Sequence, residues 1–173
     1  METTTQIKHI AELTRADQAS IDQLNQQTFP EHAGDYTWAP VDWFVLVYAG
    51  DVLASKVEIV DRIGTVAGQP VHLGGIGGVG TLPALRRRGL SSIALRAAVD
   101  FMGAKLDVAF GLLICEPQTI PLYQVLGWQV INAPLSFDQP GREKVLFDEI
   151  TMVLPCAGQA WPAGPVDLCG LPW

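Results

Sequence analysis

Hydrophobic and polar positions along the first half of the chain repeat with two different periods. Residues 14–17 are typical of a helix start, and Ile21 and Leu24 follow at a spacing that puts them on the inner face of that helix. Residues 43–48 form a continuous apolar run, and residues 52–60 alternate after a Gly-Asp turn signal. This second pattern predicts two antiparallel strands joined as a hairpin.

The second half of the chain predicts strands interleaved with helices. Residues 29–40 are typical of a loop over a site or of a short helix, residues 61–70 of a turn region with a short strand, and residues 156–173 of a Pro- and Gly-rich tail. The remaining elements follow in chain order: a glycine-rich strand at 71–81, a helix at 91–102, a buried strand at 108–114, a short helix at 117–126, and strands at 128–131 and 150–154. This order predicts an α/β fold in which helices flank a mixed central β-sheet.

Length and composition fit one domain. The chain has 173 residues, of which 49% are hydrophobic and 17% charged, so it is long enough to bury a single core. We expect residues 1–155 to form the domain and the tail at 156–173 to pack on it. A homodimer contact through the tail stays open.

Charge and cysteine content narrow the function classes. The net charge of −7 argues against nucleic-acid partners, which need clustered Lys and Arg. It is compatible with a cationic substrate, and equally with a role in solubility alone. The three cysteines are widely spaced and the three histidines scattered, so neither a disulfide framework nor a metal site is predicted. The polar N-terminus and the lack of a long apolar run predict no signal peptide and no membrane partner, and favour a cytoplasmic protein.

The strongest chemical signal is the segment 79–92, in which a glycine-bearing strand is followed by three arginines and a helix start. The first turn of a helix has free N–H groups and the positive end of the helix dipole, so it binds anions. Arginines add charge for phosphate groups, and glycines let a ligand lie along the strand backbone. A pyrophosphate with an extended arm describes coenzyme A.

Other interpretations of this segment are weaker. A Walker A loop would need Gly-Lys-Ser/Thr after the glycines, and a dinucleotide fingerprint would place its glycines at a strand-to-helix turn. Here Gly75, Gly77 and Gly78 lie inside the predicted strand. A basic cluster that only caps a helix start stays open from the residues alone.

Two motifs carry a family resemblance. The segment 86–91, Arg-Arg-Arg-Gly-Leu-Ser, resembles motif A of the GNAT (GCN5-related) acetyltransferases, Arg/Gln-x-x-Gly-x-Gly/Ala, with Ser91 in place of the usual Gly or Ala. The segment 121–128, Pro-Leu-Tyr-Gln-Val-Leu-Gly-Trp, is similar to a second family segment that carries a Tyr and ends in Gly-Phe/Trp. The resemblance covers about residues 72–131 and implies the GNAT fold and N-acetyl transfer from acetyl-CoA, with no metal.

Carried onto this chain, the resemblance implies a donor site and an acid. The amides of residues 87–92 would hold the pyrophosphate, the backbone of Val79 and Thr81 would pair with the pantetheine arm, and Tyr123 would protonate the leaving thiolate. The residues expected to bind acetyl-CoA are Val79, Gly80, Thr81, Arg86, Arg87, Arg88, Gly89, Leu90, Ser91 and Ser92.

The C-terminal half is similar to the aminoglycoside 2′-N-acetyltransferases. The likeness lies in Tyr123, Gly127-Trp128, Asp148, the strand at 152–155 and a tail that ends in Trp173. In that family the terminal carboxylate is part of the aminoglycoside site. The resemblance implies a cationic, amine-bearing antibiotic as the acetyl acceptor.

The base used by that family is missing here. Its Glu, which acts through water, has as its counterpart Gly77 or a neighbour. Glu116 and the carboxylate of Trp173 are candidates to replace it, unless the amine arrives partly neutral and needs no base. Because carboxylates and aromatic faces attract cations, the residues expected to bind substrate are Asp35, Trp38, Asp42, Glu116, Asp148 and Trp173.

The leading prediction is therefore acetylation of an aminoglycoside or aminocyclitol antibiotic, with a role in antibiotic resistance. One alternative is a GNAT enzyme for another small amine or an amino acid. The other is a CoA-binding domain without turnover, which the missing Glu favours and Tyr123 opposes.

Overall fold

The computed structural model describes residues 2–29, 36–147 and 149–173. The strands within them are β1 (Thr3–His9), β2 (Trp43–Ala49), β3 (Val52–Val66), β4 (Gln69–Thr81), β5 (Phe110–Cys115), β6 (Gln129–Ile131), β7 (Leu135–Phe137), β8 (Val145–Phe147), β9 (Ile150–Pro155) and β10 (Val166–Asp167). The helices are α1 (Arg15–Thr28), α2 (Leu90–Lys105) and α3 (Ile120–Gln124), with 3-10 turns at Ile10–Glu12, Pro83–Leu85 and Pro117–Thr119. No helix in the described ranges is long and apolar enough to cross a membrane.

The ten strands of the described chain form one mixed sheet. Its order is β6-β9-β5-β4-β3-β10-β7-β8, and β1 and β2 join it at the first half of β3. The long strand β3 pairs with β4 along one edge and with β2 and then β10 along the other. The pair β4–β5 is parallel, whereas β3–β4 and β5–β9 are antiparallel.

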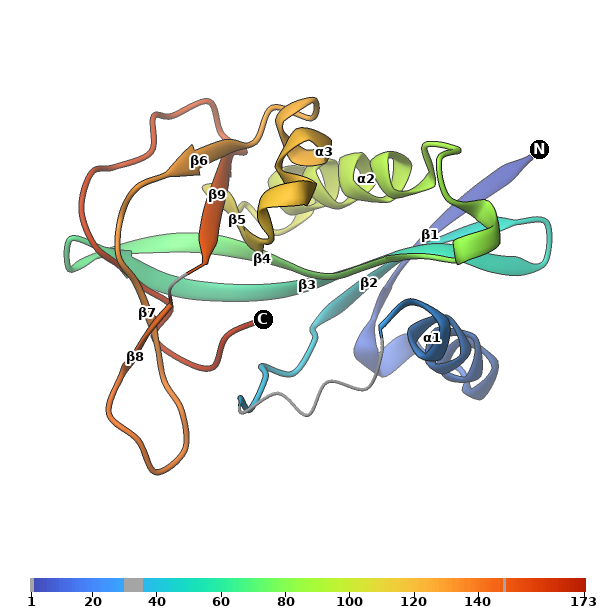
Figure 1. Ribbon diagram of the computed structural model, residues 1–173, viewed down its shortest axis with the longest axis horizontal. Coiled ribbons are helices and arrows are strands. Elements are labelled where there is room, and N and C mark those ends of the chain that lie inside the picture. The colour runs from blue at the N-terminus through green and yellow to red at the C-terminus, as the bar shows by residue number, and fades with distance from the viewer. Residues whose placement is uncertain (1, 30–35, 148) are drawn as a thin grey trace.

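Helices cover both faces of this sheet. Figure 1 shows α1 on one face and α2 with α3 on the other. The alternation of side chains along β2 explains the arrangement, because successive residues of a strand point to opposite faces. Val45 and Val47 pack in the cluster that contains α2, whereas Leu46 packs against Ile21 and Leu24 of α1. The predicted α/β fold class, a mixed sheet with flanking helices, is confirmed.

A capping box fixes the start of α1. The Thr14 side chain accepts a hydrogen bond from the N–H of Asp17, and the Asp17 carboxylate accepts one of 2.9 Å from the N–H of Thr14. Lys8 donates from Nζ to the same carboxylate at 2.8 Å. The hydrogen bond from Lys8 is the main cause that lowers the pKa of Asp17 to about 2. This anchor helps set the direction of α1, whose last turns reach the cavities described below.

The strands β4 and β5 separate beyond a short paired segment. The two strands pair only from Leu73 opposite Phe110 to Ile76 opposite Leu113, although β4 continues to Thr81. At the same level the register between β3 and β4 shifts, and Gly78 has a φ of +53°. This β-bulge turns β4 away from its former course and leaves the β5 side of its last residues unpaired among the described strands.

Some elements differ from the sequence expectation. The region 61–70 is the closed end of the long β3–β4 hairpin, which turns at Ala67 and Gly68, both with positive φ. The strands β1, β7, β8 and β10 are not predicted by periodicity, because two to seven residues with half-exposed faces are stabilised by distant partners. Within the tail, β10 pairs with Thr65 and Val66 of β3 and with β7.

Candidate active site

A cavity of about 610 Å³ lies where the end of β4 meets the starts of α2 and α3, and we call it the arginine-loop cavity. The described residues that line it are Thr28, Phe29, Val79, Gly80, Thr81, Arg86, Arg87, Gly89, Leu90, Ser91, Ser92, Thr119, Leu122 and Tyr123. They include nine of the ten residues expected from the sequence to bind acetyl-CoA, that is, all except Arg88. The motif and the strand before it are thus brought together around one space.

The start of α2 suits this cavity for an anion. Gly89 is the N-cap residue and has no side chain to occupy the first N–H groups of the helix. The helix runs for 16 residues, and its first residues Leu90, Ser91 and Ser92 line the cavity. Unsatisfied amides, the positive end of the dipole and the neighbouring Arg86 and Arg87 together attract phosphate oxygens.

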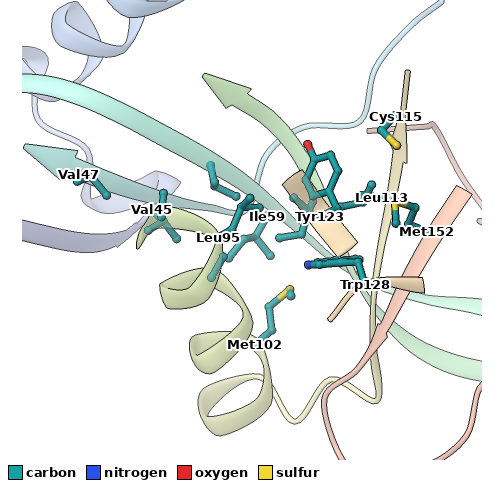
Figure 2. Packing of buried hydrophobic residues seen from close by; sticks show 14 of the residues in the cluster. Val45, Val47, Ile59, Leu95, Met102, Leu113, Cys115, Tyr123, Trp128 and Met152 are labelled. Atoms are coloured by element: carbon teal, nitrogen blue, oxygen red, sulfur yellow. The ribbon is translucent and has the colours of Figure 1, made fainter. Parts of the chain in front are cut away.

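Tyr123 lies on the opposite wall of the arginine-loop cavity. Its side chain belongs to the core cluster under α2, with its ring 6.3 Å from the ring of Trp128 in an edge-to-face arrangement. Figure 2 shows the hydroxyl at the end of the ring that points away from Trp128. Burial is the main cause that raises the pKa of Tyr123 to about 12, with a smaller contribution from Cys115. The phenol is therefore protonated at neutral pH and can donate a hydrogen bond.

A second cavity, of about 730 Å³, adjoins the first, and we call it the tryptophan cavity. It is lined by Asn25, Gln26, Phe29, Trp38, Ala39, Val41, Lys56, Glu58, Val60, Ile76, Gly77, Gly78, Ile114 and Trp173. Its position follows from the split of the sheet, because Ile76 and Gly77 on β4 and Ile114 on β5 line it just where the two strands separate. Phe29, at the end of α1, lines both cavities.

Lys56 and Glu58 form an ion pair in the wall of the tryptophan cavity. They are two residues apart on β3 and so project from the same face, whereas Val57 and Ile59 pack in the core under α2. The Lys56 side chain is only 1% exposed and donates from Nζ to the Glu58 carboxylate and, at 3.0 Å, to the carbonyl of Gly78. Burial lowers the pKa of Lys56, and the charge of Glu58 opposes that shift.

Glu58 is the residue that sequence reasoning missed. It lies opposite Gly77, the position at which a Glu was expected. The carboxylate is thus supplied to that place by the neighbouring strand and is 22% exposed in the cavity wall. A usable signal was present in the sequence, because Lys56 and Glu58 are charged residues at alternate positions of a strand covered on both faces. Such residues are rarely buried without a partner.

Trp173 reaches the same cavity from the tail. Its indole Nε1 donates to the carbonyl of Leu112 at 3.2 Å, and its ring occupies the space that a side chain on Gly75 would need. Arg62 donates to the carbonyl of Leu171 at 2.5 Å and lies over the Trp173 ring, 5.4 Å from its centroid. Trp38 lines the cavity as well, so two of the six residues expected to bind substrate are brought together.

The other expected residues are not brought together there. Glu116 is exposed, accepts a hydrogen bond from the side chain of Gln118, and is not among the described residues that line either cavity. Residues on both sides of it line the cavities, Ile114 the tryptophan cavity and Thr119 the arginine-loop cavity, but Glu116 itself lines neither, so its roles as base and as substrate ligand stay predictions. Asp42 accepts a hydrogen bond of 2.8 Å from the N–H of Asp61, which commits its carboxylate to holding the backbone. Asp35 and Asp148 lie outside the described residues.

Metal ligation has no basis in the described part of the chain. No group of three or more His, Cys, Asp or Glu side chains that could hold a metal ion occurs among those residues. His72, one of the three histidines, is within hydrogen-bond distance of Asp61 at 2.5 Å on the hairpin.

Comparison with known proteins identifies the family. The model of the acetyltransferase (GNAT) domain family matches residues 7–131. The chain belongs to the GNAT acetyltransferases. It is therefore an acetyl-CoA-dependent acetyltransferase domain. The finer likeness to aminoglycoside 2′-N-acetyltransferases is not part of this match and stays a prediction.

Solved structures of GNAT proteins share the fold. The chain matches YhbS from Escherichia coli, determined in complex with CoA, with a TM-score of 0.67 and 15% identity over 96% of this chain and 89% of that one. It matches E. coli ElaA with a TM-score of 0.64 and 18% identity over 88% of this chain and 99% of that one. A GCN5-related N-acetyltransferase from Kribbella flavida matches with a TM-score of 0.58 and 19% identity over 74% of this chain, which spans only 33% of that protein. No curated protein sequence matches the chain.

Proposed function

We propose that this chain transfers the acetyl group of acetyl-CoA to the amino group of a small amine, with acetyl-CoA in the arginine-loop cavity and the amine in the tryptophan cavity. One observation carries the proposal. Consecutive residues of β4 line the two cavities, Gly77 and Gly78 the tryptophan cavity and residues 79–81 the arginine-loop cavity. Adjoining sites hold two reactants together and so replace a bimolecular encounter by a step within one complex.

The donor site follows from the motif and the split sheet. The pyrophosphate would bind the amides at the start of α2, beside Arg86 and Arg87. The pantetheine arm would lie along residues 79–81, beside which β5 no longer pairs with β4. Buried backbone groups need hydrogen-bond partners, so an extended ligand can complete the sheet at this point.

In the proposed reaction the lone pair of the amine nitrogen forms a bond to the thioester carbonyl carbon. The C–S bond then breaks, and its electron pair leaves on the CoA sulfur. Glu58 accepts the proton that the nitrogen loses, and the Tyr123 hydroxyl donates its proton to the sulfur and regains one from water. Support for these roles is the placement of Glu58 in the tryptophan cavity and of Tyr123 in the arginine-loop cavity.

The identity of the amine is a separate step of the proposal. An aminoglycoside or aminocyclitol antibiotic, the acceptor expected from the sequence, carries several ammonium groups and would need several carboxylates. Among the described side chains that line the tryptophan cavity, one is a carboxylate, that of Glu58, and it is already paired with Lys56; the main-chain carboxyl of Trp173 lies beside Gly77. This charge balance favours the alternative acceptor, another small amine.

Release of free thiol from acetyl-CoA tests the function. The panel should include monoamines, amino acids, polyamines, an aminoglycoside and kasugamycin, and mass spectrometry should confirm acetylation of the amine. Amine-dependent release with an acetylated product is the expected result. Binding of acetyl-CoA without release on any amine would replace the proposal by the CoA-binding domain without turnover.

A further inference from the structure

The side chains that line the tryptophan cavity carry almost no net charge and are largely apolar. Its charged side chains in the described lining are Lys56 and Glu58, which form one ion pair, and the main-chain carboxyl of Trp173 lies beside Gly77. Eight of its fourteen lining residues have apolar or aromatic side chains, among them Phe29, Trp38 and Trp173. Burying apolar surface of a ligand against such walls is favourable at about 25 cal/mol per Å², whereas a second ammonium group placed there would lose its hydration without a partner.

The backbone around Trp38 is held in place although the residue is exposed. Trp38 is 51% exposed, which is unusual for a residue of this size. The backbone on either side is fixed, because Gln139 accepts from the N–H of Thr37 at 2.8 Å and donates to the carbonyl of Thr37 at 2.9 Å. The N–H of Ala39 donates to the carbonyl of Pro172 at 2.7 Å. Gln139 itself is buried, so the segment is clamped from inside the fold.

An aromatic residue on an ordered backbone segment that lines a cavity is a partly preformed contact surface. Because its backbone is already ordered, a ligand that packs on Trp38 loses less conformational entropy than it would on a mobile segment. Across the cavity, Trp173 is anchored by its hydrogen bond to Leu112 and by Arg62. Aromatic rings packed on such surfaces bind more tightly than the burial of their apolar area alone would give.

From these observations we infer that the acetyl acceptor is a monoamine whose single amino group is joined by a short chain to an aromatic ring, that is, a primary arylalkylamine. The ring packs on Trp38 in the tryptophan cavity, and the amino group lies toward Glu58 and the end of the acetyl-CoA arm. This assignment rests on the proposed acetyl transfer and adds the chemical class of its acceptor. Trp38 is then the residue that selects the ring.

A matched series of amines tests the class. We would measure kcat/KM for thiol release with propylamine, 2-phenylethylamine, spermidine and kanamycin. We expect 2-phenylethylamine to exceed propylamine by at least about 10-fold, and to exceed spermidine and kanamycin. If none of the amines supports thiol release, the proposed function and this inference are both overturned. Release in which the ring gives no advantage, or in which the polycations are preferred, would overturn the inference alone.

Variants locate the ring on Trp38. In Trp38→Ala we expect KM for 2-phenylethylamine to rise about 5- to 10-fold, and the ratio of kcat/KM for 2-phenylethylamine to that for propylamine to fall by about the same factor. Gln139→Ala, which releases the clamp without altering the cavity wall, should raise the same KM by a smaller factor. Leu146→Ala is the matched control, because Leu146 is exposed and lies outside both cavities. An equal loss for both amines in Trp38→Ala, or an unchanged KM for 2-phenylethylamine, would show that Trp38 does not bind the ring.

Discussion

The carboxylate of Glu58 occupies the space that a side chain on Gly78 would need, and the backbone at Gly78 has a φ of +53°. Lys56 is part of the same contact, since a Cβ on Gly78 would lie 2.7 Å from its Nζ. The β-bulge in β4 therefore does two things at one residue. It separates β4 from β5, and it makes room for a carboxylate where the two cavities meet.

Replacing Gly78 by alanine should consequently damage catalysis more than folding. The added methyl group displaces Glu58 and Lys56, so we expect kcat to fall at least about 10-fold. The positive φ also costs about 1–2 kcal/mol of stability for any residue with a Cβ. Gly50→Ala is the control, because Gly50 has a φ of +60° and no atom within 4 Å of the added methyl. Thermal unfolding and kcat measured for both variants separate the effects, and an equal loss of kcat in the two would speak against a role for the contact with Glu58.

Tyr123→Phe should lower kcat about 100-fold and leave the Kd for acetyl-CoA nearly unchanged. The substitution removes only the proton donor, and the ring keeps its place against Trp128. Because the pKa of Tyr123 is about 12, the parent should show no loss of rate from ionisation of this phenol up to about pH 10. Tyr48→Phe is the matched control, since Tyr48 contacts Asp17 and lies outside both cavities. A Tyr123→Phe enzyme with the kcat of the parent would remove this hydroxyl from the mechanism.

Asp17 should contribute to stability in a defined pH range. Its pKa is lowered from 3.8 to about 2 in the folded chain. A group with a depressed folded pKa stabilises the fold above its unfolded pKa, and this contribution is lost as the pH falls from about 4 to about 2. We expect Asp17→Asn to cost about 1 kcal/mol at pH 7, an estimate reduced for screening by solvent, and to flatten the pH dependence of unfolding in this range. Urea denaturation at a series of pH values would measure it, and identical acid dependence in the two proteins would show that another group is responsible.

The residues of the arginine-loop cavity could be grouped from sequence because they are nearly contiguous. The strand end, the arginine loop and the first turn of α2 occupy one short stretch of chain, and their chemistry depends on local backbone geometry. The second motif adds Tyr123, which reaches the same cavity from α3. Local patterns of this kind can be recognised without knowledge of which strands are neighbours.

The tryptophan cavity could be predicted only in part, because its residues are distant in sequence. Glu58 acquires its place from the register between β3 and β4, which sets it opposite Gly77. Trp38 depends on a clamp by Gln139, and Trp173 on contacts with Arg62 and Leu112. Periodicity reports which face a residue lies on, but it cannot report which element covers that face. The sequence favours Glu116 because it follows an apolar run, and Ile114 at the end of that run does line the tryptophan cavity, but the exposed Glu116 lines neither cavity.

The most direct test of Glu58 as the catalytic base compares two glutamates. We would measure kcat/KM for amine-dependent thiol release at neutral pH in the parent, in Glu58→Gln and in Glu116→Gln, with the best amine of the panel. If Glu58 is the base, kcat/KM should fall about 100-fold or more in Glu58→Gln, with little change in the Kd for acetyl-CoA, and activity in Glu116→Gln should stay close to that of the parent. Parental activity in a folded Glu58→Gln enzyme, or a large loss in Glu116→Gln alone, would show that Glu58 is not the base.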